Sequence, residues 1–171
     1  DYEYRAIVVD AAGNTSTTNS VTVTVDTTAT AGTLSLSNFV DSANSSDHLS
    51  NDKTFGLSLA NNETGGSVTY QVKSGSTWTD TSSTSTDHSD GNFEYRAIVT
   101  DAAGNTSTTN SVTVTIDTTA TAGSLSLSDF SDSGTSSSDL ISNDKTFGLS
   151  LAGNETSGSV TYQVKSGSSW T

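Results

Sequence analysis

The sequence of 171 residues lacks cysteine, methionine and proline, and it has only 6 basic residues against 19 acidic ones. The absence of cysteine excludes disulfides, thiolate zinc sites and cysteine nucleophiles. A formal net charge of −13 argues against nucleic acid as a partner, because so few basic side chains cannot neutralise a phosphate backbone. No run of about 18 to 20 apolar residues occurs, so the sequence predicts no membrane insertion.

Serine and threonine dominate what is present, with 33 and 31 copies, while only 30% of the residues are hydrophobic. Such a composition is also found in disordered Ser/Thr-rich stalks. Here, however, the apolar residues fall in ordered patterns that recur along the chain. These patterns predict a folded protein.

An internal repeat organises the chain. Residues 2–39 match residues 93–130 with five differences, and residues 50–79 match residues 142–171 with three. The offset grows from 91 to 92 because one residue is inserted between the two matched blocks. A period near 91 residues is too long for a solenoid repeat and has the size of a small domain, which predicts an array of nearly identical modules.

The boundaries of these modules are predicted from a repeated junction. The segments Val25–Thr30 (V-D-T-T-A-T) and Ile116–Thr121 (I-D-T-T-A-T) each lie between two predicted strands. We therefore expect residues 1–26 to be the C-terminal part of one repeat, residues 27–117 a complete repeat, and residues 118–171 the N-terminal part of a further repeat. We also expect neighbouring repeats of the same chain to be partners, and the partial repeats to complete each other by head-to-tail self-association.

Apolar residues alternate with polar ones in five segments of the module, as expected for half-buried antiparallel strands. These segments contain Leu34/Leu36, Phe55/Leu57/Leu59, Val68/Tyr70/Val72, Tyr95/Ala97/Val99 and Val112/Val114/Ile116. Clusters of Gly, Asn, Asp and Ser separate them and predict turns. About seven short strands in about 91 residues predict an all-β fold of tandem immunoglobulin-like antiparallel β-sandwich domains.

Two aromatic residues and one polar stretch refine this prediction. Trp78 is expected to end the strand that starts at Val68 and to lie in the core of the sandwich. Tyr95 is expected to begin the next long strand, in the position of a tyrosine corner. The stretch Thr79–Gly91 has no apolar residue, so we expect an exposed loop or a weak edge strand there.

Three motifs resemble those of a known family. The segments Tyr95–Ser107 (Y-R-A-I-V-T-D-A-A-G-N-T-S), Val114–Ala120 (V-T-I-D-T-T-A) and Asp132–Thr146 (D-S-G-T-S-S-S-D-L-I-S-N-D-K-T) are similar to tandem bacterial Ig-like extender repeats of giant RTX-type adhesins exported by type I secretion. The resemblance covers essentially the whole chain. It implies long extracellular rods that calcium stiffens at the domain junctions. The family often has proline after D-T-T-A, where this chain has Thr30 and Thr121.

The strand order of such a sandwich places acidic residues at both ends of the module. The loop Asp41–Asp52 is expected beside the exit at Asp117, and the loop with Asp101 and Asn105 beside the turn that carries Glu63. Head-to-tail stacking would then bring oxygen ligands together at each junction. The candidate ligands are Asp26, Asp41, Asp47, Asp52, Glu63, Asp101, Asn105, Asp117, Asp132, Asp139, Asp144 and Glu155. The expected ion is calcium, which takes about six to eight oxygens in flexible geometry, whereas magnesium prefers a tight octahedron.

A second interpretation of these acidic loops stays open. Asp and Asn in turns also cap their own backbone, and acidic surface is common in secreted proteins. The segment Asp101–Asn105 (D-A-A-G-N) is equally well explained as a tight hairpin turn with Gly104 in a left-handed conformation. Neither an EF-hand loop nor a calcium-binding nonapeptide occurs.

The sequence predicts no enzyme. No G-x-S-x-G elbow, phosphate-binding glycine loop or H-E-x-x-H pair is present. His48 is Leu140 in the second copy, and we expect His48 and His88 to be surface residues. The leading hypothesis is a structural extender (spacer) that projects the distal ligand-binding region of a cell-surface adhesin. The alternatives are a directly adhesive module that binds glycans or sister molecules in a biofilm, and an accessory domain of a secreted hydrolase.

Overall fold

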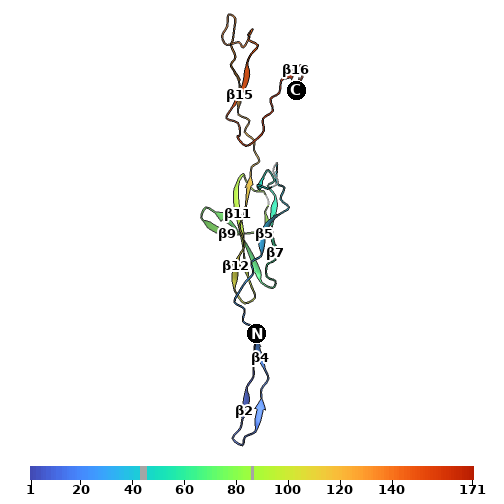
Figure 1. Cartoon of the computed structure of the whole chain (residues 1–171), viewed down its shortest axis with the longest axis vertical. Coiled ribbons are helices and arrows are strands. Elements are labelled where there is room, and N and C mark those ends of the chain that lie inside the picture. Colours follow the sequence, from blue (N-terminus) through green and yellow to red (C-terminus); the bar gives the residue numbers. More distant parts are fainter. Residues whose placement is uncertain (43–45, 86) are drawn as a thin grey trace. The chain divides into compact units, whose positions relative to one another are not determined.

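In the computed structural model, the described residues are 1–42, 46–85 and 87–171. Their secondary structure is β-strand, from β1 to β17, so the predicted all-β class is confirmed. No helix in this described part is long and apolar enough to cross a membrane. The chain divides into two compact units, Asp1–Thr118 and Thr119–Thr171, and Figure 1 labels some of their strands. The division into partial repeats stays a prediction.

The first unit contains a β-sandwich of two sheets. One sheet has three strands in the order β10-β7-β5, and the other has six, in the order β6-β13-β11-β8-β9 with β12 paired to β11. The strands are β5 (Thr33–Ser37), β6 (Leu49–Ser50), β7 (Phe55–Ala60), β8 (Ser67–Ser74), β9 (Thr77–Thr81), β10 (Thr84–Ser85), β11 (Gly91–Thr100), β12 (Thr106–Thr108) and β13 (Val112–Ile116). Neighbouring strands are antiparallel, except β6 and β13, which are parallel.

The hydrophobic core forms where the inner faces of the two sheets meet. In β11 and β13, buried residues alternate with more exposed ones, as the pleat of a half-buried strand requires. The buried members are Leu34, Phe55 and Leu57 from one sheet and Tyr95, Ala97, Val112, Val114 and Ile116 from the other. The alternation predicted from the sequence is therefore confirmed for these strands.

Trp78 does not belong to this core, so the prediction for it is wrong. β8 ends at Ser74, and Trp78 lies in the next strand, β9, after a turn at Gly75. Trp78 is the cross-strand partner of Lys73, and directly opposite residues of two paired strands share a face. The ring therefore lies on the outer face of the sheet, 4.3 Å from Arg96 Cζ and 5.6 Å from Lys73 Nζ.

Tyr95 and His88 also differ from expectation. Tyr95 lies in the middle of β11 and not at its start, and its hydroxyl is 3.2 Å from His88 Nε2. His88 is half-buried and stacks on Phe55 with ring centroids 4.9 Å apart, so it is not a plain surface residue. Burial lowers the pKa of His88 because it disfavours the charged imidazolium.

The polar stretch Thr79–Gly91 contains the weak edge strand that the sequence predicts. β9 extends to Thr81, and the two residues of β10 then pair with Phe55 and Gly56 of β7. Residue 86 of this stretch lies outside the described residues. A short strand of this kind covers the edge of β7 without any apolar side chain of its own.

Residues 1–26 form two strand pairs of their own. β1 (Tyr2–Tyr4) pairs with β4 (Val21–Val23), and β2 (Ile7–Val9) pairs with β3 (Thr15–Thr17). The register is that of the matching residues of the sandwich, in which β11 pairs with β13 and β12. This segment is therefore a copy of one half of the sandwich, and its apolar side chains are exposed.

The second unit copies the other half. β14 (Ser124–Ser128) pairs with β15 (Gly148–Ala152) as β5 does with β7, and β16 (Lys165–Ser166) pairs with β17 (Ser169–Trp170). Residues 159–164 form no strand, although residues 159–166 are identical in sequence to β8. The reason is the missing partners, because this unit, all of whose residues are described, contains no counterpart of β11 and, in β17, that of only the start of β9.

Candidate metal centre

Glu63 holds the chain where it enters the sandwich. Glu63 N donates to the carbonyl oxygen of Thr30 at 3.0 Å, and Thr30 N donates to Glu63 Oε2 at 2.9 Å. Glu63 lies between β7 and β8, whereas Thr30 belongs to the linker before β5. One residue of the sandwich therefore pairs with both backbone groups of one linker residue.

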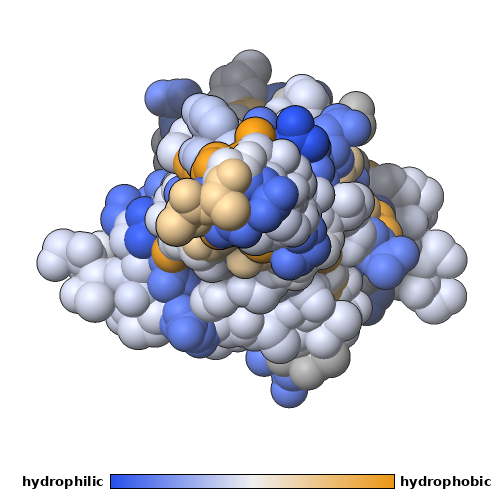
Figure 2. All heavy atoms as spheres, turned by 90° about the horizontal axis from the view of Figure 1, so that it is seen from below, coloured by the Kyte–Doolittle hydropathy of each residue, from blue (hydrophilic) through white to orange (hydrophobic). Residues whose placement is uncertain are grey.

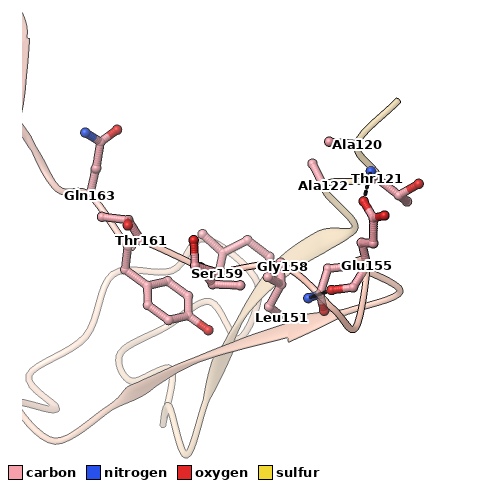
Figure 3. Close-up of a pocket in the computed structure, with 13 residues that line it drawn as sticks. Ala120, Thr121, Ala122, Leu151, Glu155, Gly158, Ser159, Thr161 and Gln163 are labelled. Atoms are coloured by element: carbon pink, nitrogen blue, oxygen red, sulfur yellow. Dashed lines mark hydrogen bonds between the residues drawn. The ribbon is translucent and has the colours of Figure 1, made fainter. Parts of the chain in front are cut away.

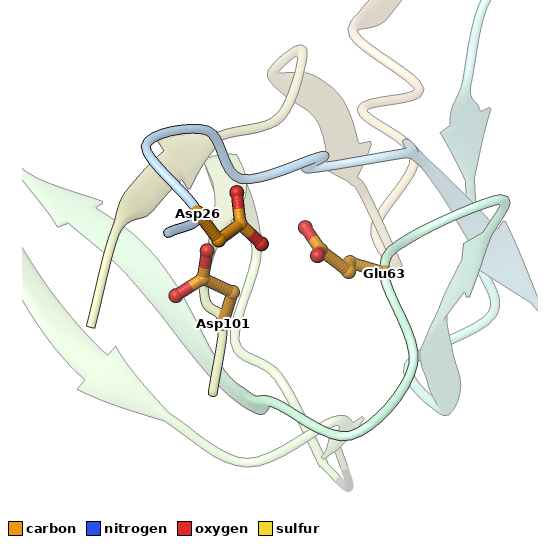
Figure 4. Close-up of side chains that lie close together, drawn as sticks. All are labelled: Asp26, Glu63 and Asp101. Atoms are coloured by element: carbon orange, nitrogen blue, oxygen red, sulfur yellow. The ribbon is translucent and has the colours of Figure 1, made fainter. Parts of the chain in front are cut away.

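Three carboxylates meet beside this contact. Asp26 lies in the linker after β4, Glu63 between β7 and β8, and Asp101 at the end of β11, and Figure 4 shows the three side chains converging. One carboxylate oxygen of each residue lies within 4.8 Å of the others. Asp101 is buried, Glu63 is half-buried and Asp26 is exposed. Three negative charges thus gather at one end of the sandwich.

Asn105 organises the Asp101 side of this cluster. Its backbone N and its Nδ2 donate to the two carboxylate oxygens of Asp101, each at 2.7 Å. Nδ2 also donates to the carbonyl oxygen of Asp26 at 3.0 Å. Gly104 has φ +92°, so the predicted tight turn with a left-handed glycine is confirmed. The turn and the carboxylate cluster are thus two aspects of one local structure.

Hydrogen bonding keeps Asp101 ionised. The side-chain hydrogen bond from Asn105 is the largest cause that lowers the pKa of Asp101, and backbone N–H groups of the turn add to it. Hydrogen bonds to a carboxylate favour its charged form. Asp101 therefore carries a negative charge at neutral pH, next to two further acidic side chains.

The donor atoms of this cluster fit a hard cation. Asp26, Glu63 and Asp101 supply carboxylate oxygens, which are the ligands that calcium prefers in proteins. Lys53 pairs with Asp87 and Lys73 pairs with Glu94, so these two lysines are engaged elsewhere. Like charges that lie this close repel each other, and a bound divalent cation removes the repulsion.

The predicted ligands of the Asp41–Asp52 loop are bonded to their own backbone. Asp41, Asp47 and Asp52 each accept a hydrogen bond from N–H groups within or beside the loop, and the N–H of Thr54 lowers the pKa of Asp52. Asp41 Oδ1 is buried and has no hydrogen-bond partner among the described residues. Residues 43–45 of this loop lie outside the described residues. A ligand role for the three acids stays a prediction.

The second copy of this loop repeats the pattern. Asp132, Asp139 and Asp144 accept hydrogen bonds from neighbouring backbone N–H groups, and the N–H of Thr146 is the largest cause that lowers the pKa of Asp144. Asp132 Oδ1 is again buried without a partner among the residues described. Agreement between the copies supports the capping interpretation for this loop, and the ligand role of these residues stays a prediction as well.

The two remaining candidates lie in different units. Glu155 repeats the contact of Glu63: Thr121 N donates to Glu155 Oε2 at 3.3 Å, drawn in Figure 3, and Glu155 N donates to Thr121 O at 3.0 Å. Asp117 N donates to the carbonyl oxygen of Ser50 at 2.9 Å, so Asp117 adjoins the loop that ends at Asp52. The predicted ligand group around Asp117 stays a prediction.

Sequence reasoning missed how the linker is bound. The contact between Thr30 and Glu63 uses backbone atoms of the linker, which carry no residue-specific pattern. One signal was present, because Thr30 and Glu63 recur together as Thr121 and Glu155 at nearly the same separation. A pair that recurs in two copies of a module is a candidate for a contact within the module.

Two family models match the chain. A model described as a bacterial Ig-like domain matches residues 28–118, which include every strand from β5 to β13. A second model with the same description matches residues 1–27. No curated protein matches the chain significantly. Because the first model alone covers more than half of the residues and the observed sandwich agrees with it, the chain belongs to the bacterial Ig-like domain family.

Proposed function

We propose that this chain is a structural extender of a giant RTX-type bacterial adhesin, exported by type I secretion, and that calcium at its junctions stiffens the rod. Bacterial Ig-like domains are typically non-enzymatic and often occur in extracellular or surface proteins, which is consistent with a structural or adhesin-type module. The observation that carries the calcium proposal is the carboxylate cluster. Asp26 belongs to the linker, whereas Glu63 and Asp101 belong to the sandwich, so an ion held by all three would join the two.

The physical role of the ion follows from charge and position. Calcium would supply positive charge to Asp26, Glu63 and Asp101, beside the point where Glu63 already pairs with Thr30. The linker would then lose freedom to rotate against the sandwich. With a net charge of −13, repulsion between modules would also fall as cations bind. β11 has ten residues, so each sandwich adds roughly 30 Å of reach.

The test is thermal unfolding of the 171-residue chain in EDTA and across a calcium titration, with small-angle scattering on the same samples. An ion that binds only the folded form raises Tm by mass action. When the free ion is at a hundredfold excess over Kd, the free energy of unfolding rises by about 2.7 kcal/mol. We expect the rise to disappear in Glu63→Gln, whose amide oxygen still accepts a hydrogen bond, and in Asp101→Asn. Asp80→Asn is the control, since Asp80 accepts from Gln71 outside the cluster. A Tm and a particle length that do not respond to calcium would contradict the proposal.

A second candidate function rests on Trp78. We expected this residue in the core, yet it lies on the outer face of the sheet beside Arg96 and Lys73. A half-buried aromatic ring on the outer face of the sheet, near polar residues of the paired strands such as Gln71 and Asp80, is a chemically suitable surface for a sugar, so the directly adhesive module stays a candidate. Binding of residues 28–118 to a glycan array, lost in Trp78→Ala but retained in Val40→Ala at another exposed position, would favour it over the spacer.

A further inference from the structure

A row of three polar side chains crosses the outer face of the six-stranded sheet. Gln71 in β8 pairs with Asp80 in β9 on one side and with Arg96 in β11 on the other. Arg96 stands between the buried Tyr95 and Ala97, so the alternation of the strand directs it away from the core. Arg96 Nε donates to Gln71 Oε1, and Gln71 Nε2 donates to Asp80 Oδ1, each at 2.9 Å. The guanidinium is therefore held in place through its Nε.

A second row lies beside the first on the same face. Lys73 in β8 pairs with Trp78 in β9, and Lys73 Nζ donates to Glu94 Oε2 in β11 at 2.7 Å. The indole of Trp78 reaches the first row, since its ring centroid is 4.3 Å from Arg96 Cζ. Attraction between a guanidinium and an aromatic ring stabilises this contact. Trp78 is half-buried, so part of its ring stays accessible to a ligand.

Arg96 differs from the other cations of the sandwich in its partners. Residues 28–118 contain three basic residues, Lys53, Lys73 and Arg96, and both lysines form ion pairs. Arg96 forms none with any residue that the structure describes, although the net charge of the chain is −13. Within the same described residues its two Nη groups donate no hydrogen bond. They form a planar pair of donors that matches the two oxygens of a carboxylate.

A hollow adjoins the two rows. It is lined by Lys73, Asn92, Glu94 and Thr113 among others. Its volume of about 380 Å³ lies within the range of about 300–1,000 Å³ that is usual for small-molecule sites. Lys73 and Glu94 also belong to the second row, so a ligand in the hollow lies next to that row. The amide, hydroxyl and carboxylate groups of the lining can hydrogen-bond to hydroxyl groups of a ligand.

Two carboxylates near Arg96 limit the charge of a ligand. Asp80 ends the first row, and Glu94 stands two residues before Arg96 in β11. The hydrogen bond from Lys73 is the largest cause that lowers the pKa of Glu94, so Glu94 is ionised at neutral pH. One carboxylate of a ligand can pair with the guanidinium, whereas a second one would be repelled by these acids. Hydroxyl groups have the opposite preference, because they donate hydrogen bonds to carboxylates.

The surroundings favour a sugar over a protein as the ligand. Polar and charged side chains surround Trp78 in the two rows. On the face in view, Figure 2 shows hydrophobic side chains, in orange, in small patches among hydrophilic ones. The centre of a protein interface is more apolar than this. A sugar needs a ring to cover its C–H groups and hydrogen-bonding groups around that ring, which Trp78 and the two rows supply.

We propose that the outer face of β9, β8 and β11 binds a hexuronate residue of a glycan, which is a sugar with one carboxylate. The carboxylate accepts two parallel hydrogen bonds from the Nη groups of Arg96, and the sugar ring packs beside Trp78. The sugar hydroxyls donate to Asp80 and Glu94. This inference rests on the second candidate function above, and it adds the class of sugar and the residue that selects it.

The residues of this site recur with the sequence repeat. Arg5 matches Arg96 and Trp170 matches Trp78, and the other residues of the two rows that have a counterpart in the chain are also identical. Each complete repeat of this sequence therefore carries one site. Several weak sites on one chain raise the affinity for a polymeric glycan, because binding at the second site is intramolecular.

The test is an NMR titration of the isotope-labelled 171-residue chain, in EDTA so that calcium cannot bridge a sugar carboxylate to the acidic loops. The probes are methyl β-D-glucuronide and methyl β-D-glucoside, which differ in one carboxylate against one hydroxymethyl group. The indole N–H of Trp78, assigned with the variant Trp170→Phe, reports binding. We expect the glucuronide to bind about tenfold or more tightly than the glucoside, because hydrogen bonds to charged groups are the stronger ones.

Three variants identify the residue that selects the acidic sugar. Arg96→Lys keeps the charge but loses the planar pair of donors, and we expect it to weaken glucuronide binding about tenfold. Arg5→Lys is the matched control, because Arg5 has no aromatic ring beside it among the described residues, and it should bind like the parent chain. Asp80→Asn removes a like charge and should tighten glucuronide binding about two- to fivefold. Such a gain cannot result from misfolding.

The outcomes separate this inference from the function on which it rests. Equal affinity for the two sugars, or equal losses in Arg96→Lys and Arg5→Lys, would overturn the acidic sugar and leave the adhesive module as a candidate. No response to either sugar would overturn both. A preference for the glucuronide that depends on Arg96 supports both.

Discussion

Two segments of this protein have the same eight residues and different structures. Residues 67–74 form the whole of β8, whereas in residues 159–166 only Lys165 and Ser166 are in a strand. The difference is the neighbours: β8 pairs with β11 over six residues and with β9 over five, whereas the second unit has no counterpart of β11 and, in β17, that of only the start of β9. The preference of a sequence for strand is therefore realised only when a partner supplies hydrogen bonds and a face to pack against.

The antiparallel pair β14–β15 shows the opposite behaviour. It keeps all five residue pairs that β5 and β7 make in the sandwich, although most of its leucine side chains are exposed. Its two strands are both present in the second unit, so the pairing does not depend on the missing half. Some strand pairs therefore form within one half of the sandwich, whereas others need both halves.

The largest expected effect comes from supplying the missing half covalently. In a chain with residues 80–118 repeated after Thr171, residues 159–164 should become a strand, and their amide exchange should slow by about a thousandfold or more, because they join a cooperatively folded domain. Hydrogen exchange followed by mass spectrometry measures this. The control carries Ser in place of the added counterparts of Tyr95 and Val114. Equal exchange in both chains would show that the partner strand is not the cause.

Substitution of matched tyrosines should have the next largest effect. Tyr95 is buried and contacts Phe55, so Tyr95→Ala is expected to lower the free energy of unfolding of the sandwich by about 3–5 kcal/mol. Tyr4 has the same sequence neighbours but is exposed, and Tyr4→Ala should change it by less than about 0.5 kcal/mol. Urea unfolding of dilute protein gives both values. Similar losses would mean that residues 1–26 already have a covered core.

Matched glycines should give a smaller difference. A Cβ added at Gly66 would lie 2.1 Å from the carbonyl oxygen of Thr100, whereas one added at Gly158 would meet nothing within 4 Å. Gly66→Ala is therefore expected to destabilise the sandwich by about 1–3 kcal/mol through backbone displacement. Gly158→Ala should leave thermal unfolding unchanged. If Gly158→Ala were as destabilising as Gly66→Ala, the second unit would already be packed like the sandwich.

The smallest effect is expected from pH. The folded-state pKa of Asp101 is lowered, mainly by Asn105, so Asp101 stabilises the sandwich above its unfolded pKa of about 3.9, and this contribution is lost as the pH falls through the lower folded pKa. Asn105→Ala should weaken that dependence and lower Tm at neutral pH. Melting curves between about pH 7 and pH 2 measure it.

The exposed turn of residues 1–26 provides the control for the pH prediction. Asn14 lowers the pKa of Asp10 as Asn105 does that of Asp101, but that turn lies outside the sandwich. Asn14→Ala should therefore raise the pKa of Asp10 in an NMR titration and leave the melting of the sandwich unchanged. A parallel change of both melting curves would contradict the assignment of the effect to Asp101.

The sheets were predictable because period-two alternation identifies inner faces without further knowledge, as for Tyr95, Ala97 and Val99. Strand order also predicted that Asp101, Asn105 and Glu63 share an end of the sandwich with Asp26, where the structure places them. These inferences depend only on the direction of each strand and on whether a residue stands at an odd or an even position along it. A regular antiparallel sandwich keeps both.

What failed depended on details of turns and packing. Trp78 faces outward because the turn after Ser74 is short and pairs Trp78 with Lys73. The sequence pattern does not predict where one strand ends and the next begins. His88 lies in a stretch without apolar residues, yet it packs on Phe55, a contact between residues far apart in sequence. The sequence also left two roles possible for the Asp side chains of the loop Asp41–Asp52. An Asp that caps its own backbone and an Asp that binds an ion have the same local sequence.

The parallel pairing of β13 with β6 gives the sandwich a particular response to tension. Thr115 N and Asp117 N donate to the carbonyl oxygens of His48 and Ser50, so the last strand before the exit is held by β6 on one side and by β11 on the other. A force that pulls the chain outward at Asp117 slides β13 along both neighbours. These bonds then have to break together and not one after another, which raises the barrier to forced unfolding, and that process is governed by the unfolding rate and not by equilibrium stability. A module built this way would resist the drag of flowing water even if its free energy of folding were small.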